Sequence, residues 1–237
     1  MVRRFNLIGN GRAGGSLHRA LIDKGWVCGS IFGRDDDPVD AAKGVDVCII
    51  AVSDGAIAKI AEQIDPGDAA VVHLSGATPL SALGAHRGAA LHPLVSVAEP
   101  DSGAELLASA FFAIGGDPIA EEMAELLSGK WFHIEDSDRG LYHAAAAVAS
   151  NHLVALLGQV ERMANEIDVP FEAFLPLVQS SIRNVAELGP RAALTGPAAR
   201  GDEETIAKHL GALREVMPDE IAAYEVLVGE ARRLADR

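Results

Sequence analysis

The chain has 237 residues, enough for two small domains that each bury a core of their own. Hydrophobic residues make up 49 % of it, which excludes a disordered chain. Its 20 basic and 34 acidic side chains give a formal charge of −14, and this acidic excess disfavours binding to nucleic acid or to an anionic membrane. No apolar stretch reaches the length of a membrane span and no signal peptide is evident, so we expect a cytoplasmic protein with no membrane partner.

Cysteine and histidine usage points away from disulfides and metals. Cys28 and Cys48 lie in apolar segments, which favours two core thiols in a reducing compartment. The sequence has no H-E-x-x-H and no C-x-x-C pattern, so we predict no metal site.

Short apolar runs alternate with helical stretches over the first half of the chain. The predicted strands span residues 4–8, 26–32, 46–52, 69–74, 89–91, 111–114 and 131–134. The predicted helices span residues 12–24, 119–127 and a segment that begins at Ser53 or Asp54 and ends at Gln63. The run 46–52 is almost entirely apolar, as a parallel strand buried on both faces should be. The alternation predicts an α/β fold with a doubly wound parallel sheet of the Rossmann type.

The second half of the chain has a different pattern. After Ser137 no segment has the pattern of a strand, and a long helix is predicted over residues 139–167. Prolines and glycines separate the helices that follow. We therefore predict an α/β domain over residues 1–137 and an all-α domain over residues 138–237.

A glycine-rich turn joins the first predicted strand to the first predicted helix. It reads Gly9, Asn10, Gly11, Arg12, Ala13, Gly14 and matches G-x-G-x-x-G. Gly9 permits a tight turn, Gly11 leaves room for a pyrophosphate, and Gly14 lets helix and strand pack closely. The free N–H groups of the first helical turn would face the phosphates. The motif predicts a dinucleotide-binding domain; the alternative is an ordinary glycine-rich turn.

The end of the second predicted strand bears on the choice of dinucleotide. Arg34 stands there, and its forked guanidinium suits the 2′-phosphate of NADP. The alternative is that Arg34 is solvated and Asp35 binds the ribose of NAD. We expect NADP, with NAD possible.

Polar residues follow several of the predicted strands, where ligands of an open parallel sheet bind. Ser53 either caps a helix or meets the cofactor. Ser75 lies in a tight turn and could orient a substrate. His92 ends a strand before Pro93, so it is either a proton donor or a structural histidine.

Two further groups of polar residues lie in the helical half. Tyr142 and His143 open the long helix, and His143, Ala147 and Asn151 are spaced to share one face. We predict that Tyr142 contacts substrate and that Asn151 holds a substrate oxygen, unless Asn151 only bonds a neighbouring backbone group. Arg200 either clamps a substrate carboxylate or is a solvated loop residue.

Together these segments resemble a family that joins an NADP-binding Rossmann-like domain to a helical domain of unknown function. The family is related to the 6-phosphogluconate dehydrogenase C-terminal-domain-like enzymes, which include pyrroline-5-carboxylate reductase, ketopantoate reductase and deazaflavin-dependent NADP oxidoreductases. The resemblance covers nearly the whole chain and rests on residues 7–14, 73–76, 91–94, 142–151 and 193–202. It implies NADP binding and pairing of two chains through the helical domain, with no settled substrate.

One departure separates this chain from the related β-hydroxyacid dehydrogenases, which carry a catalytic lysine one helical turn before an asparagine. If Asn151 matches that asparagine, Ala147 stands in place of the lysine. His143, one further turn back, is the nearest substitute.

The leading hypothesis is an NADP-dependent oxidoreductase that transfers a hydride to a small carbonyl or imine. His92 or His143 would give the proton, while Asn151 and Ser75 orient the substrate between the two domains. The helical domain would form a homodimer. The alternative is a non-catalytic NADP-binding sensor or partner-binding protein.

Overall fold

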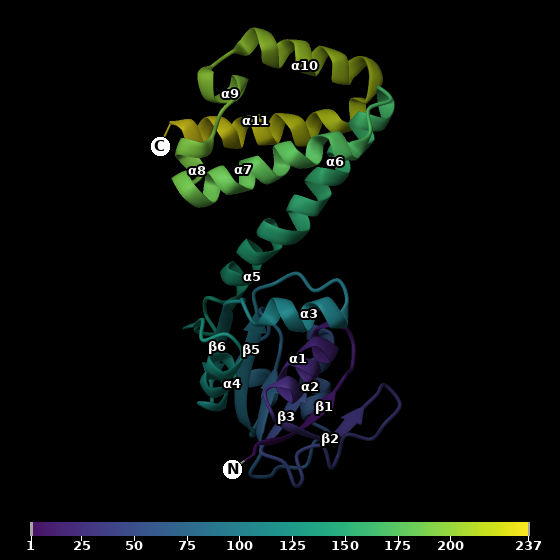
Figure 1. Ribbon diagram of the computed structural model, residues 1–237, viewed down its shortest axis with the longest axis vertical. Coiled ribbons are helices and arrows are strands. Elements are labelled where there is room, and N and C mark those ends of the chain that lie inside the picture. Colours follow the sequence, from purple (N-terminus) through teal and green to yellow (C-terminus); the bar gives the residue numbers. More distant parts are fainter. Residues whose placement is uncertain (1, 237) are drawn as a thin grey trace. The chain divides into compact units, whose positions relative to one another are not determined.

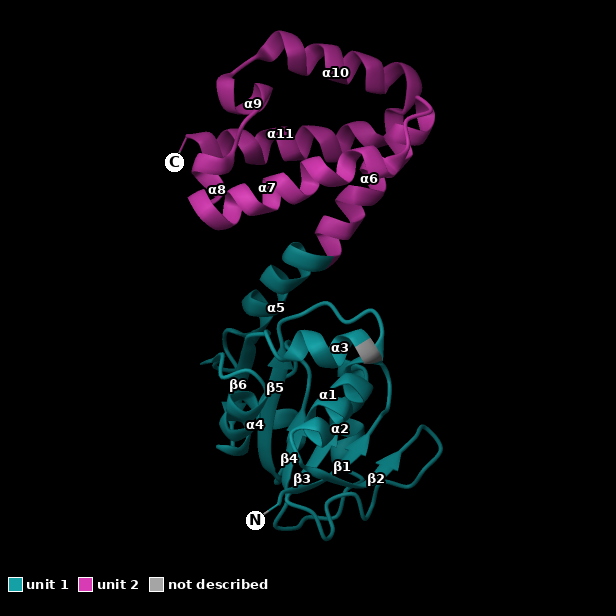
Figure 2. Cartoon of the chain, in the orientation of Figure 1, with its two compact units in different colours: residues 1–150 teal, residues 151–237 magenta. Residues whose placement is uncertain are grey.

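A computed structural model describes residues 2–236, except for the side chain of Asp101. The chain divides into two compact units, residues 1–150 and 151–237 (Figure 2). The division falls later than the predicted boundary, because the first turns of the long helix pack on the first unit. The buried side chain of Arg139 is the clearest of these contacts.

The first unit is built on a seven-stranded sheet with the order β2-β1-β3-β4-β5-β6-β7 (Figure 1). The strands are β1 (Arg4–Ile8), β2 (Val27–Phe32), β3 (Val47–Ile50), β4 (Ala70–His73), β5 (Arg87–Pro93), β6 (Phe112–Gly116) and β7 (Trp131–His133). Neighbouring strands are parallel except β5 and β6, which are antiparallel. The predicted α/β fold of the Rossmann type is confirmed, with a mostly parallel sheet in which β6 and β7 run antiparallel to the other strands.

Helices cover both faces of this sheet. The helices of this unit are α1 (Arg12–Asp23), α2 (Asp54–Ala61), the short 3₁₀ helix η1 (Leu80–Leu83), α3 (Pro100–Leu107), α4 (Ile119–Leu127) and α5 (Arg139–Ala147), of which all but α5 pack on the two faces. One core, around Phe5 and Phe112, packs against α1, α3 and α4. The other, around Ile50 and Ile57, packs against α2 and η1. Burial on both faces explains the unbroken apolar runs of the central strands.

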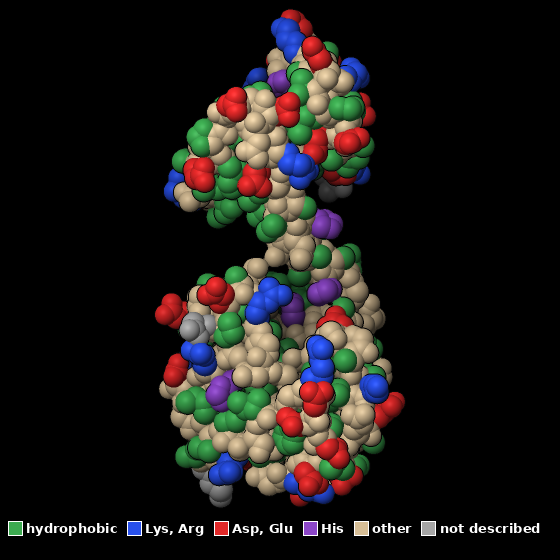
Figure 3. Space-filling model, turned by 90° about the vertical axis from the view of Figure 1, so that its right-hand side faces the viewer, with side chains coloured by type: hydrophobic (Ala, Val, Ile, Leu, Met, Phe, Trp, Pro, Cys, Tyr) green, Lys and Arg blue, Asp and Glu red, His purple; other side chains and the backbone are tan. Residues whose placement is uncertain are grey.

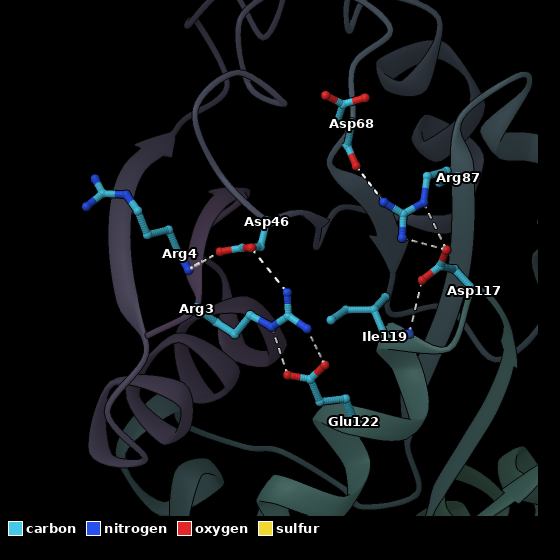
Figure 4. Close-up of polar contacts among 8 residues, drawn as sticks. All are labelled: Arg3, Arg4, Asp46, Asp68, Arg87, Asp117, Ile119 and Glu122. Carbon is cyan, nitrogen blue, oxygen red and sulfur yellow. Dashed lines mark hydrogen bonds and ion pairs between the residues drawn. The ribbon is translucent and has the colours of Figure 1, made fainter. Parts of the chain in front are cut away.

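Charged side chains tie the amino ends of the strands together (Figure 4). Arg3, just before β1, forms two hydrogen bonds with Glu122 on α4, at 2.9 and 2.7 Å, and one with Asp46, at 3.2 Å. Asp46 lies just before β3 and also accepts a bond from the Arg4 N–H at 2.8 Å. These bonds connect β1, β3 and α4 at one edge.

A second group of charges lies across a cavity of about 310 Å³ at the same edge. Arg87, which opens β5, donates two hydrogen bonds to one oxygen of Asp117, at 3.1 and 2.9 Å, and one to the Asp68 carbonyl at 2.6 Å. The other oxygen of Asp117 accepts from the Ile119 N–H at 3.1 Å and so satisfies the first turn of α4 (Figure 4).

The regular elements among the described residues of the second unit are all helices, as the sequence predicts. It contains α6 (Leu153–Glu166), η3 (Phe171–Phe174), α7 (Leu175–Leu188), α8 (Pro190–Ala193), α9 (Pro197–Arg200), α10 (Glu203–Val216), η4 (Pro218–Glu220) and α11 (Ile221–Ala235). Only Gln159, Ala164 and Ile206 are buried among its described residues. Hydrophobic side chains gather on the face of this unit that Figure 3 shows.

A π-helical turn, η2 (Val148–His152), joins α5 to α6, so that residues 139–166 form one continuous helical run. By length and composition alone this run is apolar enough to cross a membrane, which corrects the expectation that no such stretch exists. One such helix is weak evidence for a span. The run carries Arg139, Glu161, Arg162 and Glu166, so charge is present at both ends.

Candidate active site

The glycine-rich turn has the geometry that a bound dinucleotide requires. Gly9 has a φ of +89°, and a Cβ there would lie 2.4 Å from the Ala51 carbonyl oxygen. A Cβ on Gly14 would lie 2.1 Å from the Gly9 carbonyl oxygen, whereas a Cβ on Gly11 would meet nothing within 4 Å. At Gly9 and Gly14 nearby backbone atoms leave no room for a side chain, whereas Gly11 faces open space.

The start of α1 leaves backbone N–H groups available above this turn. Gly11 is the N-cap and forms no side-chain capping bond. The first-turn N–H groups and the helix dipole together favour an anionic group at this place. The turn follows β1, which lies beside β3. From β1 the chain continues to β2 on one side, and from β3 it continues to β4 on the other side, so the turn lies at the switch point where such sheets bind ligands. These residues fit a dinucleotide pyrophosphate.

Arg34 and Ser53 lie near the ends of the strands that flank this turn. The Gly9 N–H donates to the Phe32 carbonyl at 2.9 Å, which links the turn to the end of β2, two residues before Arg34. Arg34 is exposed and forms no hydrogen bond or ion pair with the residues that the structure describes. Ser53 is the N-cap of α2, yet its side chain makes no capping bond and is exposed. Both side chains are accessible to a ligand.

A second group of polar side chains lies at the carboxyl ends of β4 and β5. His92 Nδ1 lies 2.6 Å from the Tyr142 hydroxyl, and the His92 and His143 rings are 6.0 Å apart. A Cβ on Gly76 would lie 3.0 Å from both imidazoles, so the absent side chain at Gly76 leaves room beside them. The structure thus brings together His92, Tyr142 and His143, which the sequence places in two separate groups.

Burial keeps this pair uncharged at neutral pH. Burial and the nearby His143 and Arg139 lower the pKa of His92 to about 4. Burial raises the pKa of Tyr142 to about 12. Both groups are therefore neutral near pH 7 and share one hydrogen bond. A neutral His92 is a hydrogen-bond partner of the phenol and carries no acidic proton of its own at that pH.

Ser75 is largely occupied by its own turn. Its hydroxyl oxygen accepts from the Ala77 and Thr78 N–H groups at 3.2 and 3.0 Å, and its N–H donates to His73 Nδ1 at 3.2 Å. The Ser75 side chain therefore shapes the turn that ends at Gly76 and Thr78. Its hydroxyl hydrogen is still available to a ligand.

Two buried titratable side chains near this site, His73 and Arg139, were not selected from the sequence as site residues. His73 and Arg139 are 0 % and 1 % exposed, and Arg139 Nε donates to Asp136 at 2.8 Å. Burial, and after it the Arg139 charge, lowers the pKa of His73 to about 4. A Cβ on Gly115 would lie 2.8 Å from Arg139 Nη2, so the glycine makes room for the guanidinium. The spacing of three residues between Asp136 and Arg139 is the one feature of the sequence that indicates this ion pair.

Asn151 and Arg200 belong to the second unit. Asn151 lies in the π turn and is exposed. Arg200 ends α9 with its side chain 65 % exposed, 4.0 Å from Asp202. Asp202 caps α10 by accepting from the Thr205 N–H at 3.1 Å.

Solved structures show the same fold over nearly the whole chain. Protein TM1727 of Thermotoga maritima is 26 % identical, with a TM-score of 0.78, and 98 % of each chain is covered. A candidate NADP oxidoreductase of Bacteroides fragilis is 23 % identical, with a TM-score of 0.82 and 98 % of each chain covered. A reductive aminase of Aspergillus terreus is 15 % identical, with a TM-score of 0.73 over 98 % of this chain and 94 % of the other.

Among curated proteins the chain has no match. The family described as "Domain of unknown function (DUF2520)" matches residues 112–231, which is half of the chain, from β6 through most of α11. This match and the shared fold agree with the resemblance drawn from the sequence. The chain belongs to the DUF2520 family.

Proposed function

We propose that the chain is an NADP-dependent oxidoreductase that reduces a small carbonyl or imine. The observation that carries this proposal is the His92–Tyr142 hydrogen bond at the carboxyl edge of the sheet that also presents the glycine-rich turn. Proteins of similar fold support it: a reductive aminase in complex with NADPH, and a pyrroline carboxylate reductase with NADP bound.

In this proposal the cofactor lies with its pyrophosphate on the Gly9–Gly14 turn. Asn10, Gly11, Arg12 and Ala13 contribute backbone N–H groups there, and the accessible Ser53 hydroxyl contributes a polar contact. Arg34 binds the 2′-phosphate, which selects NADP over NAD. When bound, the cofactor supplies the hydride.

The chain's own residues supply the proton. As a hydride adds to the substrate carbon, the electron pair of the C=O or C=N bond moves onto the oxygen or nitrogen. Tyr142 donates its hydroxyl proton to that atom, and neutral His92 orients the phenol and stabilises the phenolate that remains. His143, next to both rings, is the second candidate donor. Ser75 orients the substrate through its hydroxyl hydrogen.

The test follows NADPH oxidation with a panel of small imines and carbonyl compounds. Tyr142→Phe removes the proton and should lower kcat by about a hundred-fold while the Kd for NADPH stays unchanged. Tyr224→Phe is the matched control, because Tyr224 forms the same 2.6 Å bond with His209 on the surface of the second unit. Equal turnover by wild type and Tyr142→Phe would contradict the assignment.

A non-catalytic NADP-binding sensor is the alternative. It is favoured by Ala147, which takes the place of the catalytic lysine of the related dehydrogenases if Asn151 matches their asparagine. NADPH binding that depends on the glycine-rich turn, with no oxidation above background by any compound of the panel, would support the sensor.

We also propose that two copies pair through the second unit. Ile182, Val185 and Leu188 lie at intervals of three on α7 and are 53 %, 43 % and 60 % exposed. Three buried residues among the described part of this unit make a very small core, and a second copy would cover this apolar stripe. Light scattering should report a dimer, and Val185→Glu should give a monomer; a wild-type monomer at micromolar concentration would contradict the proposal.

Two smaller expectations accompany this assignment. Arg200, exposed on the second unit, is the residue we expect to bind a substrate carboxylate if the substrate has one. A reducing cytoplasmic setting fits the free thiols of Cys28 and Cys48.

A further inference from the structure

The amide of Asn6 is a buried polar group in the middle of β1. It is 5 % exposed and lies on the same face of the sheet as Cys48, its partner on β3. Its Nδ2 donates to the Ala41 carbonyl at 2.8 Å, and its Oδ1 accepts from the Ser30 N–H at 2.7 Å. One side chain thus bonds two segments that lie 24 and 35 residues after it in the sequence.

The Ser30 bond coincides with an irregularity in the pairing of β1 with β2. Phe5 pairs with Cys28 but Leu7 pairs with Ile31, so β2 contains one extra residue opposite Asn6. A Cβ on Gly29 would lie 2.6 Å from Asn6 Oδ1. The amide therefore occupies the space that a side chain at Gly29 would take, and it provides the acceptor for the bulged strand.

The two segments bonded by Asn6 flank Arg34. Ser30 lies on β2 before Arg34, and Ala41, fully buried, anchors the segment after it. Between β2 and β3 the chain forms only turns and bends, so Arg34 is not held by a helix or a strand. The position of the Arg34 guanidinium depends on how firmly both ends of this segment are fixed.

We propose that Asn6 is a positioning residue for cofactor selectivity: its amide fixes both ends of the segment that carries Arg34, and so places the guanidinium where a 2′-phosphate binds. This inference rests on the proposed function. Asn6 itself lies inside the core and contacts no cofactor. The extra residue in β2 also determines which residue reaches the end of that strand. Phe32 lies there, and its carbonyl accepts a hydrogen bond from the Gly9 N–H of the glycine-rich turn.

The test is the ratio of NADPH to NADH affinity, measured by titration calorimetry. Asn6→Val keeps a residue suited to a strand but removes both hydrogen bonds, so NADPH binding should weaken about ten-fold while NADH binding changes less than about two-fold. Val71→Ala, on the same face of the sheet, is the control for general loss of stability. Unchanged selectivity in a folded Asn6→Val protein would overturn the inference.

Two further measurements keep the result interpretable. If Asn6→Val does not fold, Gly29→Ala tests the same contact, since its Cβ would displace the Asn6 amide, and selectivity should fall again. Hydrogen exchange gives a readout independent of the cofactor: amides of residues 33–46 should exchange faster in the variants, while those of α4 do not. If wild-type protein shows no NADPH preference, the proposed function fails, and unchanged exchange over residues 33–46 would separately refute the role of Asn6.

Discussion

The sheet of the first unit has an amino edge, where its parallel strands begin, and a carboxyl edge, where they end. The two edges differ in how their polar residues are bonded. At the amino edge, Arg3, Asp46, Arg87 and Asp117 pair with one another and with backbone groups. At the carboxyl edge, α1 and α2 begin without side-chain caps, and Arg34 and Ser53 are exposed. One edge satisfies its own polar groups, and the other leaves them available.

The difference shows which edge is adapted to stability and which to binding. Paired charges at the amino edge are half-exposed, and such pairs contribute modestly to stability. Uncapped helix starts and buried histidines at the carboxyl edge cost stability. A fold retains such features where a ligand compensates for them, so experiments that separate stability from binding should separate the two edges.

The largest expected effect is on the pH dependence of stability. His73 and His92 have pKa values lowered to about 4, chiefly by burial, against 6.5 in the unfolded chain. The unfolded chain therefore binds more protons as the pH falls below 6.5, and the folded state loses stability. Between about pH 7 and about pH 5 the loss should be about 2 kcal/mol for each histidine.

Both tryptophans, Trp26 and Trp131, lie in the first unit, so their fluorescence during urea unfolding measures this effect. His92→Gln should remove roughly half of the pH dependence. The amino edge should respond only at more acid pH: the Arg4 N–H bond and the Arg3 charge lower the pKa of Asp46 below 3.8, so its contribution is lost only as the pH falls below that value. A stability that is constant from neutral pH to pH 5 would contradict this assignment.

The next largest effect separates packing from binding within the glycine-rich turn. Gly14→Ala places a Cβ 2.1 Å from a backbone oxygen and should destabilise the first unit by about 3 kcal/mol. Gly11→Ala meets nothing within 4 Å, so its unfolding curve should stay unchanged while NADPH affinity falls. Gly211→Ala, on α10 and also unobstructed, is the control. A Gly11→Ala protein that binds NADPH normally would argue against phosphate binding at this turn.

At the amino edge, Asp117 serves two partners. Asp117→Ala removes the Arg87 ion pair and the bond from the Ile119 N–H, and should destabilise the unit by about 1 to 2 kcal/mol. Asp117→Asn keeps an acceptor for the Ile119 N–H, so the difference between the two variants measures that bond. NADPH affinity should not change in either Asp117 variant. A marked change would contradict the assignment of stability to the amino edge and of binding to the carboxyl edge.

The smallest effect is expected at Arg3. Arg3→Lys loses the two parallel bonds to Glu122 and should cost less than about 1 kcal/mol, because the pair is half-exposed. The loss should shrink further in high salt. A cost that persists at high salt would show that the Arg3 cluster contributes through packing rather than charge.

Regular elements with apolar periodicity were predictable from the sequence. The predicted bounds of α4 and β1 agree with those in the structure, because large apolar residues define the buried faces of both elements. Helix α3 was missed, since it packs on α1 through a small residue: a Cβ on Gly103 would lie 2.0 Å from Ser16 Oγ. A contact face made of small residues produces no periodic pattern of large apolar residues in the sequence.

The candidate site was predictable by residue type but not by pairing. His92 and Tyr142 were both selected as candidates, yet their hydrogen bond joins residues 50 positions apart and depends on the fold. Arg139 was not selected, because an arginine is expected at the surface and its burial depends on the space left by Gly115. The extra residue in β2 was likewise invisible without the pairing of β1 with β2.

The π turn Val148–His152 changes the helical phase of the run that contains it. Four residues of α-helix turn the chain by about 400°, whereas a π-helical turn needs more residues for the same rotation. The spacing of His143, Ala147 and Asn151 therefore does not place Asn151 in line with His143, because the π turn lies between Ala147 and α6. In terms of phase, the turn acts as a one-residue insertion.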